Sequence, residues 1–204
     1  MQADLLTLSS MGCHALCVLT AITVQDTIGV ESIHALDADW VIDQARCVLE
    51  DMPVAAFKVG VMGSVDVLAA VAEVVSDYPE IPLILDPVLA SGRGDELANE
   101  AMLSAMRELL IPQTTVLTPN SIEVRRIAQG DFDDEEDTLE SCARRILDMG
   151  CEYVLVTGTH ENTPGVINQL YSREGLVRSD TWQRLPSSYH GSGCTLAPEC
   201  PVVS

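Results

Sequence analysis

The sequence has few aromatic and few basic residues. Aromatic side chains make up 4% of its 204 residues, and 11 Lys and Arg stand against 31 Asp and Glu, so the formal net charge is −20. Nucleic acids and anionic membrane surfaces both repel a chain this acidic. We therefore expect neither a nucleic acid nor a membrane among its partners.

The chain also lacks the patterns of secreted, zinc-binding and membrane-spanning proteins. Its seven cysteines are an odd number with no Cys-x-x-Cys, and no His/Cys cluster has the spacing of zinc ligands. No signal peptide opens the sequence, and no apolar run approaches the roughly 20 residues of a membrane helix. These absences predict a reduced, cytoplasmic protein.

What the chain does have is enough apolar sequence, 47% hydrophobic residues, for one α/β domain with a sizeable core. Apolar, β-branched runs alternate with amphipathic segments. Strands are expected at 15–23, 55–59, 83–85, 115–117 and 153–156, and a hairpin at 166–171 and 176–182. Helices are expected at 3–11, 38–49, 65–76, 96–110, after Asn120 and at 138–149.

This alternation predicts a mostly parallel sheet covered by helices on both faces, with the antiparallel hairpin at its edge. Ligands of such sheets bind beyond the carboxyl ends of the strands. Polar residues stand at or just after those ends, namely Gln25, Lys58, Asp86, Asn120 and Thr157.

The segment His-Gly-Ser-Gly-Cys-Thr, residues 190–195, predicts an anion site. Its small residues let the backbone approach a ligand, and a helix beginning at Cys194 would point its N-terminal dipole the same way. The Cys194 thiol could then take a proton from a hydroxyl. The alternative is a small buried cysteine that follows a glycine turn.

Carboxylates occur at two of the strand ends. Asn120 and Glu123, three residues apart at a helix start, can face the same cleft, or they can form a capping box. Asp86 ends a buried strand before a proline, where its carboxylate could help to hold a metal ion or could cap the turn.

Several stretches resemble, in order, the ribokinase-like small-molecule kinases, and within them the hydroxymethylpyrimidine and phosphomethylpyrimidine kinases of thiamin biosynthesis. They run from residue 2 to about residue 197. Many sugar kinases of this superfamily carry an aspartate where this chain has Cys194, so the cysteine indicates the vitamin-kinase branch. The stretches are Gln2–Leu5, Leu19–Thr27, Lys58–Gly63, Leu85–Val88, Thr118–Glu123, Val156–His160 and Gly191–Thr195.

The resemblance implies a ribokinase-like three-layer sandwich and a kinase that depends on ATP and Mg²⁺. Its substrate would be 4-amino-5-hydroxymethyl-2-methylpyrimidine, phosphorylated at the hydroxymethyl group, and then the monophosphate. Cys194 would be the base, and the N–H groups of Gly191, Ser192, Gly193 and Cys194 would hold the phosphoryl group. Because family members are commonly oligomers, a homo-oligomer is expected.

The resemblance also implies nucleotide and metal sites. Glu123 would order magnesium through water, with Asp86 as a second metal ligand. Thr157 stands where many members have a lysine, so a charged phosphate contact is missing, and His160 could equally be an ordinary loop histidine. The nucleotide-binding residues would be Asn120, Glu123, Thr157, Gly158 and His160.

Four residues would bind the pyrimidine. The Gln25 amide offers a donor and an acceptor to an aminopyrimidine edge, although an ordinary loop glutamine would look the same. Met62 and Val88 would form apolar walls, or they could simply pack in the core. Asp4 matches a position near the substrate hydroxyl, but it could instead cap the first helix.

The chain departs from the family at both ends. Members usually have another strand and a glycine-rich turn before Gln-Ala-Asp, and several helices after Gly-Ser-Gly-Cys, whereas Pro198 and Pro201 would interrupt a helix here. We therefore expect an incomplete kinase domain over 1–197, without the first strand and the C-terminal helices, and an atypical tail over 198–204.

Three other functions stay open at this point. A pyridoxal kinase has the same fold and a substrate that also carries a hydroxymethyl group, although Gln25 and Met62 favour the pyrimidine. The chain could also be a catalytically inactive, truncated remnant of the family. A cysteine hydrolase would need a partner for Cys194, and although His190 is close in sequence, nothing marks a carboxylate to orient it.

Overall fold

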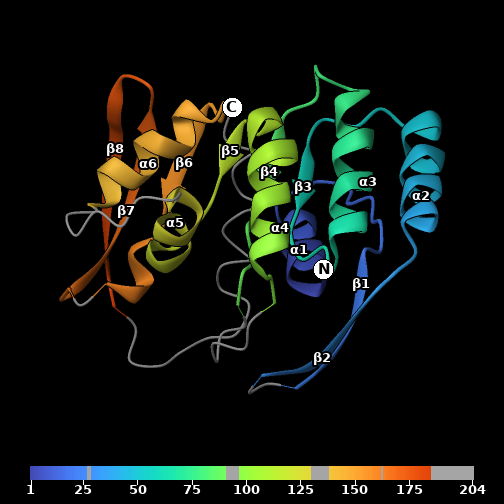
Figure 1. Cartoon of the computed structure of the whole chain (residues 1–204), viewed down its shortest axis with the longest axis horizontal. Coiled ribbons are helices and arrows are strands. Elements are labelled where there is room, and N and C mark those ends of the chain that lie inside the picture. Colours follow the sequence, from blue (N-terminus) through green and yellow to red (C-terminus); the bar gives the residue numbers. More distant parts are fainter. Residues whose placement is uncertain (27–28, 91–96, 130–137, 162, 185–204) are drawn as a thin grey trace.

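A six-stranded sheet forms the centre of the molecule. The computed structural model describes residues 1–26, 29–90, 97–129, 138–161 and 163–184. Figure 1 shows the strands side by side in the order β3-β4-β5-β6-β7-β8. Their bounds are Phe57–Val59, Leu83–Leu85, Val116–Leu117, Tyr153–Val156, Gly165–Ser172 and Gly175–Gln183.

The strands from β3 to β6 are parallel, and β7 and β8 are antiparallel to their neighbours. Leu85 of β4 pairs with Val59 of β3 and with Leu117 of β5, so the carboxyl ends of these strands lie at one edge. The predicted fold class, a mostly parallel sheet with an antiparallel edge hairpin, is confirmed.

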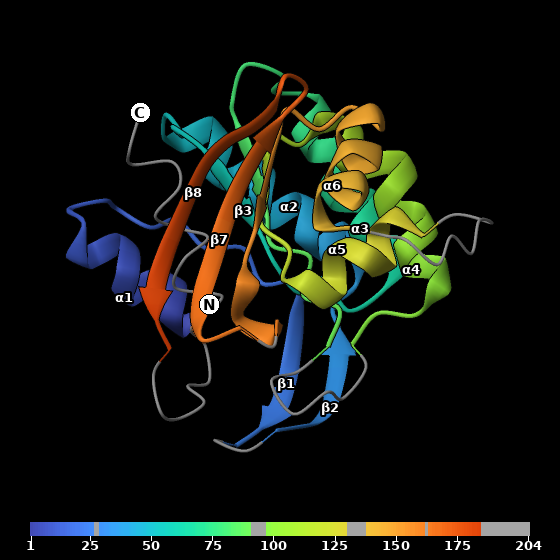
Figure 2. The same ribbon diagram turned by 90° about the vertical axis from the view of Figure 1, so that its left-hand side faces the viewer.

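The helices lie on both sides of this sheet. Figure 2 shows α3, α4, α5 and α6 together on one side and α1 on the other, and α2 packs beside α3. None of the described helices is both long and apolar enough to cross a membrane. From α1 to α6, the bounds are Gln2–Ser10, Ala38–Asp51, Val65–Ser76, Glu100–Ala105, Ser121–Ala128 and Leu139–Asp148.

Short polar side chains fix where most of these helices begin. Ser64 Oγ accepts the Val67 N–H at 3.2 Å, as predicted for the start of α3. Each such cap satisfies an N–H group that has no partner within its helix. The other helix caps of this kind are Asp37, Asn99, Asn120 and Thr138.

The core lies between the sheet and the helices α3 to α6. All three residues of β4, the strand between β3 and β5, are buried. Large, fully buried side chains from the helices complete this core, among them Leu68, Leu103, Ile127 and Ile146.

The helix predicted over 96–110 is shorter in the structure. The α-helix α4 ends at Ala105, a π-helical turn follows over Met106–Leu110, and a 3₁₀ turn covers Ile111–Gln113. Pro112 in that last turn cannot donate a helical hydrogen bond, which ends the regular helix.

The strand predicted over 15–23 is wrong in its bounds and in its environment. Only β1, Ala21–Gln25, is a strand, and it pairs antiparallel with β2, Val30–Ala35, which was not predicted. Asp26 favours this hairpin, because its carboxylate accepts the Gly29 N–H at 2.9 Å. Ile22 and Val24 are each 55% exposed, so β1 is not buried on both faces.

Candidate active site

Four of the polar residues predicted at strand ends lie at the carboxyl edge of the six-stranded sheet, namely Lys58, Asp86, Asn120 and Thr157, whereas Gln25 ends β1 of the separate two-stranded sheet. Asn120 after β5 and Thr157 after β6 form a parallel bridge. The Thr157 carbonyl accepts the Ser121 N–H at 3.1 Å, and the Thr157 N–H donates to the Pro119 carbonyl at 2.9 Å. The structure therefore brings together two of the residues predicted to bind the nucleotide.

Asn120 and Glu123 form a capping box at the start of α5. Asn120 Oδ1 accepts the N–H groups of Ile122 and Glu123, both at 2.9 Å. Glu123 Oε2 accepts the Asn120 N–H at 2.9 Å in return. The prediction that this pair forms a capping box is thus confirmed, and the capping box does not exclude a binding role.

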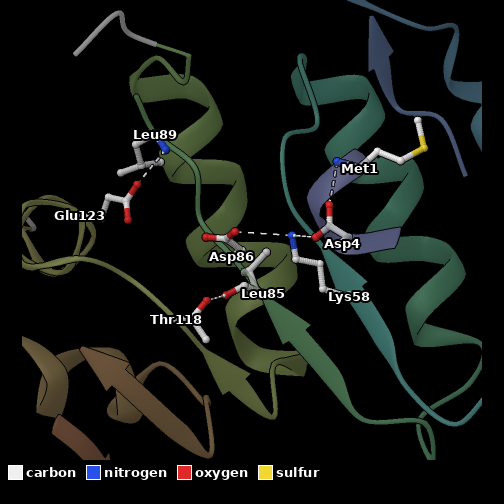
Figure 3. Close-up of polar contacts among 8 residues, drawn as sticks. All are labelled: Met1, Asp4, Lys58, Leu85, Asp86, Leu89, Thr118 and Glu123. Carbon is white, nitrogen blue, oxygen red and sulfur yellow. Dashed lines mark hydrogen bonds and ion pairs between the residues drawn. The ribbon is translucent and has the colours of Figure 1, made fainter. Parts of the chain in front are cut away.

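Glu123 is a buried carboxyl group at the centre of this site. Its side chain is 8% exposed, and its Oε1 accepts the Leu89 N–H at 3.2 Å (Figure 3). Burial raises the pKa of Glu123 to about 7, and the negative charge of Asp86 adds to the rise. The N–H groups of Asn120 and Leu89 oppose it. Glu123 is therefore held near its protonation midpoint at neutral pH.

A second cluster joins α1 to the ends of β3 and β4. Figure 3 shows Lys58 of β3 between Asp4 of α1 and Asp86, which follows β4. The Lys58 Nζ lies 2.8 Å from Asp4 Oδ1 and 3.5 Å from Asp86 Oδ2. This links a residue predicted to face the substrate to one predicted to hold the metal.

Asp4 is an ion-paired carboxylate in the first turn of α1. The N-cap residue is Met1, so Asp4 is not itself the N-cap. The amino terminus lies 2.7 Å from Asp4 Oδ2. Burial alone would raise the pKa of Asp4, but the contacts with Lys58 and the amino terminus outweigh it and lower the pKa.

The loop after β6 contains the other predicted nucleotide residues. Gly158–His160 forms a 3₁₀ turn in which His160 is exposed and Gly158 is buried. The Gly158 N–H donates to Asn168 Oδ1 at 3.3 Å, and a Cβ at this position would lie 2.2 Å from the Ile167 carbonyl oxygen. Glycine therefore lets this loop lie against β7.

Two arginines that the sequence analysis missed hold the same loop. Arg184 donates to the carbonyl oxygens of Thr159 at 2.7 Å, Glu161 at 2.8 Å and Thr163 at 3.3 Å. Arg125 of α5 donates to Glu161 Oε1 at 2.9 Å. No local sequence signal marks these contacts, because each joins segments far apart in the chain.

The residues predicted to bind the pyrimidine lie in different environments. Met62 is 2% exposed and packs in the hydrophobic core, which was the alternative to a role as a wall of the pyrimidine site. Val88 is half-buried and adjoins the cluster, since its N–H donates to the Asp86 carbonyl at 2.9 Å. Gln25 is exposed at the end of β1. Their roles toward a ligand stay predictions.

The carboxylates of Asp86 and Glu123 are the candidate metal ligands. Within the described ranges, no group of three or more His, Cys, Asp or Glu side chains could hold a metal ion by itself. Mg²⁺ is commonly bound through one or two carboxylates together with water and substrate phosphates. The two carboxylates of Asp86 and Glu123 fit that pattern.

The remaining predicted catalytic residues are Gly191, Ser192, Gly193 and Cys194. They lie outside the described residues, as does the predicted tail over 198–204. Their placement relative to Asp86 and Glu123 therefore stays a prediction.

Comparison with known proteins gives the family. The phosphomethylpyrimidine kinase family matches residues 1–200. The chain belongs to this family. It is 32% identical over 196 residues to the hydroxymethylpyrimidine/phosphomethylpyrimidine kinase of Escherichia coli K12, covering 96% of this chain and 74% of that protein.

Solved structures of vitamin kinases share the fold. The phosphomethylpyrimidine kinase of Clostridium difficile 630 has a TM-score of 0.80 at 26% identity, over 100% of this chain and 84% of that one. An ADP complex of Bacillus subtilis pyridoxal kinase has a TM-score of 0.85 at 25% identity, over 99% of this chain and 77% of that one. The family inferred from the motifs is confirmed, and its fold is shared with pyridoxal kinases.

Proposed function

We propose that this member of the phosphomethylpyrimidine kinase family transfers the γ-phosphoryl group of ATP to 4-amino-5-hydroxymethyl-2-methylpyrimidine and then to the monophosphate, in thiamin biosynthesis. The observation that carries the proposal is that Asp86 after β4 and the Asn120–Glu123 capping box after β5 lie at the carboxyl edge of the sheet, where Asn120 also bridges to Thr157 after β6. This is the edge at which α/β sheets bind their ligands.

The transfer needs three contributions from the protein. The substrate hydroxyl must lie in line with the γ-phosphorus, the phosphate charges must be neutralised, and the hydroxyl proton must go to a base. The substrate oxygen forms a bond to the γ-phosphorus while the bond to the bridging oxygen breaks, so that ADP leaves. We assign the proton to the Cys194 thiolate, and the phosphoryl oxygens to the N–H groups of Gly191, Ser192 and Gly193.

The nucleotide would lie against the edge formed by α5 and the loop after β6. Asn120 and Thr157 form a parallel bridge there, and Gly158 follows Thr157 in a 3₁₀ turn that ends at the exposed His160. The B. subtilis relative in complex with ADP supports nucleotide use by this fold. The start of α5 adds a partial positive charge that favours an anion.

Asp86 and Glu123 are the residues that would hold Mg²⁺. Such an ion would neutralise negative charge on the phosphates while the γ-phosphoryl group is transferred. The raised pKa of Glu123 fits this use, because burial and the negative charge of Asp86 both disfavour its ionised form when no cation is bound.

The pyrimidine would lie on the other side of the Asp86–Lys58 pair. Asp4 is positioned there by Lys58, and Val88 adjoins Asp86. We assign the substrate hydroxyl to Asp4 and the aminopyrimidine edge to Gln25, with Met62 and Val88 as apolar neighbours. A cytoplasmic homo-oligomer stays our expectation, to be tested by fractionation and by light scattering.

The test is a direct substrate comparison. Purified protein receives ATP, Mg²⁺ and one alcohol at a time: the hydroxymethylpyrimidine, its monophosphate or pyridoxal. ADP formation and the mass of the product are followed together. We expect the mass increase of one phosphoryl group on the pyrimidine, with the largest kcat/KM of the three. Turnover of none of them by folded protein would contradict the proposal.

Pyridoxal kinase is the second candidate, because the B. subtilis pyridoxal kinase matches this fold with a TM-score of 0.85. The Gln25→Leu variant separates the two candidates. Loss of the amide removes a donor and an acceptor that suit an aminopyrimidine. The kcat/KM for the pyrimidine should therefore fall more than that for pyridoxal. An equal fall for both substrates would remove Gln25 as a determinant of specificity.

A further inference from the structure

The sequence contains a single lysine, and the structure places it in the candidate site. Lys58 is the only Lys among the 11 basic residues, and the other ten are Arg. Its side chain is 16% exposed. A lysine side chain is usually solvated, and it rarely becomes this buried without partners. The partners here are two carboxylates that come from different elements.

These two carboxylates lie on opposite sides of the Lys58 ammonium group. Asp4 Oδ1 is 2.8 Å away, and Asp86 Oδ2 is 3.5 Å away. Both side chains are themselves poorly exposed, at 17% for Asp4 and 9% for Asp86. At this burial the attraction is much less screened by solvent than in a surface pair.

The helix that carries Asp4 is otherwise held loosely by its side chains. Thr7 is the one buried residue described for α1, and Leu6 is 70% exposed. Apolar packing therefore contributes little to fixing this helix over the sheet edge. The ion pair with Lys58 links α1 to β3, and through Asp86 to the end of β4 (Figure 3).

We infer that Lys58 is a positioning residue of the active site, which holds Asp4 on the substrate side at a fixed distance from Asp86 on the phosphoryl side. This inference rests on the proposed function. Without the ammonium, the two poorly exposed carboxylates would lose the cation that they share, and α1 would lose its ion pair with β3. The substrate hydroxyl would then be misaligned with the phosphoryl group, which typically costs about 100-fold in rate.

Two variants of Lys58 test the role kinetically. We expect Lys58→Met to lower kcat for the pyrimidine about 100-fold, with a much smaller change in the KM for ATP. Lys58→Arg should recover most of the loss, because a guanidinium group can also bridge two carboxylates. An unchanged kcat in Lys58→Met would overturn the inference. So would a loss confined to the KM of the monophosphate, which would make Lys58 a phosphate-binding group.

Arg46 supplies the matched control. It bridges two acidic residues in the same way, at 2.7 Å from Asp77 and 3.3 Å from Glu73, but it joins α2 to α3 on the surface. Arg46→Met should leave kcat unchanged. If it lowered kcat as much as Lys58→Met does, the effect of Lys58 would be general to ion pairs, and the positioning role would be wrong.

A readout that needs no activity comes from the single lysine itself. Protein labelled with ¹³C at the lysine ε-carbon gives one side-chain signal, that of Lys58. We expect Asp4→Asn to shift this signal and to lower kcat, because it removes one side of the bridge. An unshifted signal in folded Asp4→Asn would overturn the inference.

The two proposals fail in different ways. If folded wild-type protein phosphorylates no substrate, the proposed function fails, while a shifted lysine signal in Asp4→Asn still supports the bridge. If wild-type protein is active and Lys58→Met matches it, the positioning role alone is wrong. Should Lys58→Met not fold, the lysine signal decides: a shift of this signal in folded Asp4→Asn supports the bridge, and an unshifted signal overturns it.

Discussion

Asn120 and Glu123 hold each other in place at the start of α5. The Glu123 N–H donates to Asn120 Oδ1, and the Asn120 N–H donates to Glu123 Oε2, each at 2.9 Å. The same two residues are assigned here to the nucleotide and the metal ion. An observed structural role and a proposed binding role therefore fall on the same residues, and the choice of substitution can separate them.

Asn120→Ser separates them because serine is also a good N-cap. Asn120→Ala should lower the free energy of unfolding by about 1 kcal/mol, whereas Asn120→Ser should change it little. If Asn120 also contacts the phosphates, Asn120→Ser should still lower kcat/KM, of the order of 100-fold. Urea unfolding and steady-state kinetics measure the two effects. Wild-type kinetics in a stable Asn120→Ser variant would mean that Asn120 caps α5 and does not contact the phosphates.

The raised pKa of Glu123 predicts a pH dependence of stability. Between its ordinary pKa of 4.5 and the folded value of about 7, the folded protein keeps a proton that the unfolded chain has lost. The contribution of Glu123 to the free energy of unfolding is therefore complete below pH 4.5. It is lost as the pH rises through about 7, by roughly 3 kcal/mol at most. Glu123→Gln cannot ionise and should lack this loss.

The measurement is urea unfolding at pH 5 and pH 8, in the presence of a metal chelator. The free energy of unfolding of wild-type protein relative to Glu123→Gln should fall between the two pH values. A difference that stays constant would mean that Glu123 titrates at an ordinary pKa.

Gly158 should tolerate no side chain. A Cβ there would lie 2.2 Å from the Ile167 carbonyl oxygen, which is backbone and cannot move aside alone. We expect Gly158→Ala to lower the free energy of unfolding by about 3 kcal/mol. Gly12→Ala is the control, since its Cβ would meet open space and only its φ of +78° is unfavourable, at roughly 1 kcal/mol. Equal losses in the two variants would contradict the close contact.

Arg184 should stabilise the conformation of the loop after β6. Its guanidinium group donates to three loop carbonyls, and hydrogen bonds from charged groups are each worth about 2 kcal/mol. Arg184→Leu should therefore speed amide exchange around Thr159 and Glu161 and raise the KM for ATP. Arg178→Leu is the control, because Arg178 is 71% exposed on β8 and pairs there with Asp180. Unchanged exchange in Arg184→Leu would contradict the role.

Local signals were enough to predict most of the secondary structure. The bounds of α3 match because Ser64 is a strong cap, and β6 matches because an apolar run is bounded by polar residues. The hairpin around Arg173–Gly175 follows from alternation on both sides of a glycine turn. The fold class could then be predicted from the order of the elements alone.

Pairing and long-range contacts could not be predicted in this way. The apolar character of 15–23 indicated a strand buried on both faces, but β1 pairs only with β2 in a separate two-stranded sheet, where Ile22 and Val24 are exposed. Nothing near Lys58 in the sequence indicates Asp4 as its partner, and nothing near Arg184 indicates the carbonyls that it binds. Of the predicted site, the structure joins Asp86, Glu123, Asn120, Thr157 and Asp4 into connected clusters, and it leaves Gln25 exposed.

The measurement that tests the central claim most directly is the phosphorylation of hydroxymethylpyrimidine by purified protein with ATP and Mg²⁺, beside Cys194→Ala. Cys47→Ala, which changes an exposed cysteine of α2, is the control. We expect turnover in wild-type protein and in the control, and a loss of kcat in Cys194→Ala. No turnover from a cooperatively folded wild-type sample would contradict the proposed kinase activity. Full activity of Cys194→Ala would contradict the role of Cys194 as the base.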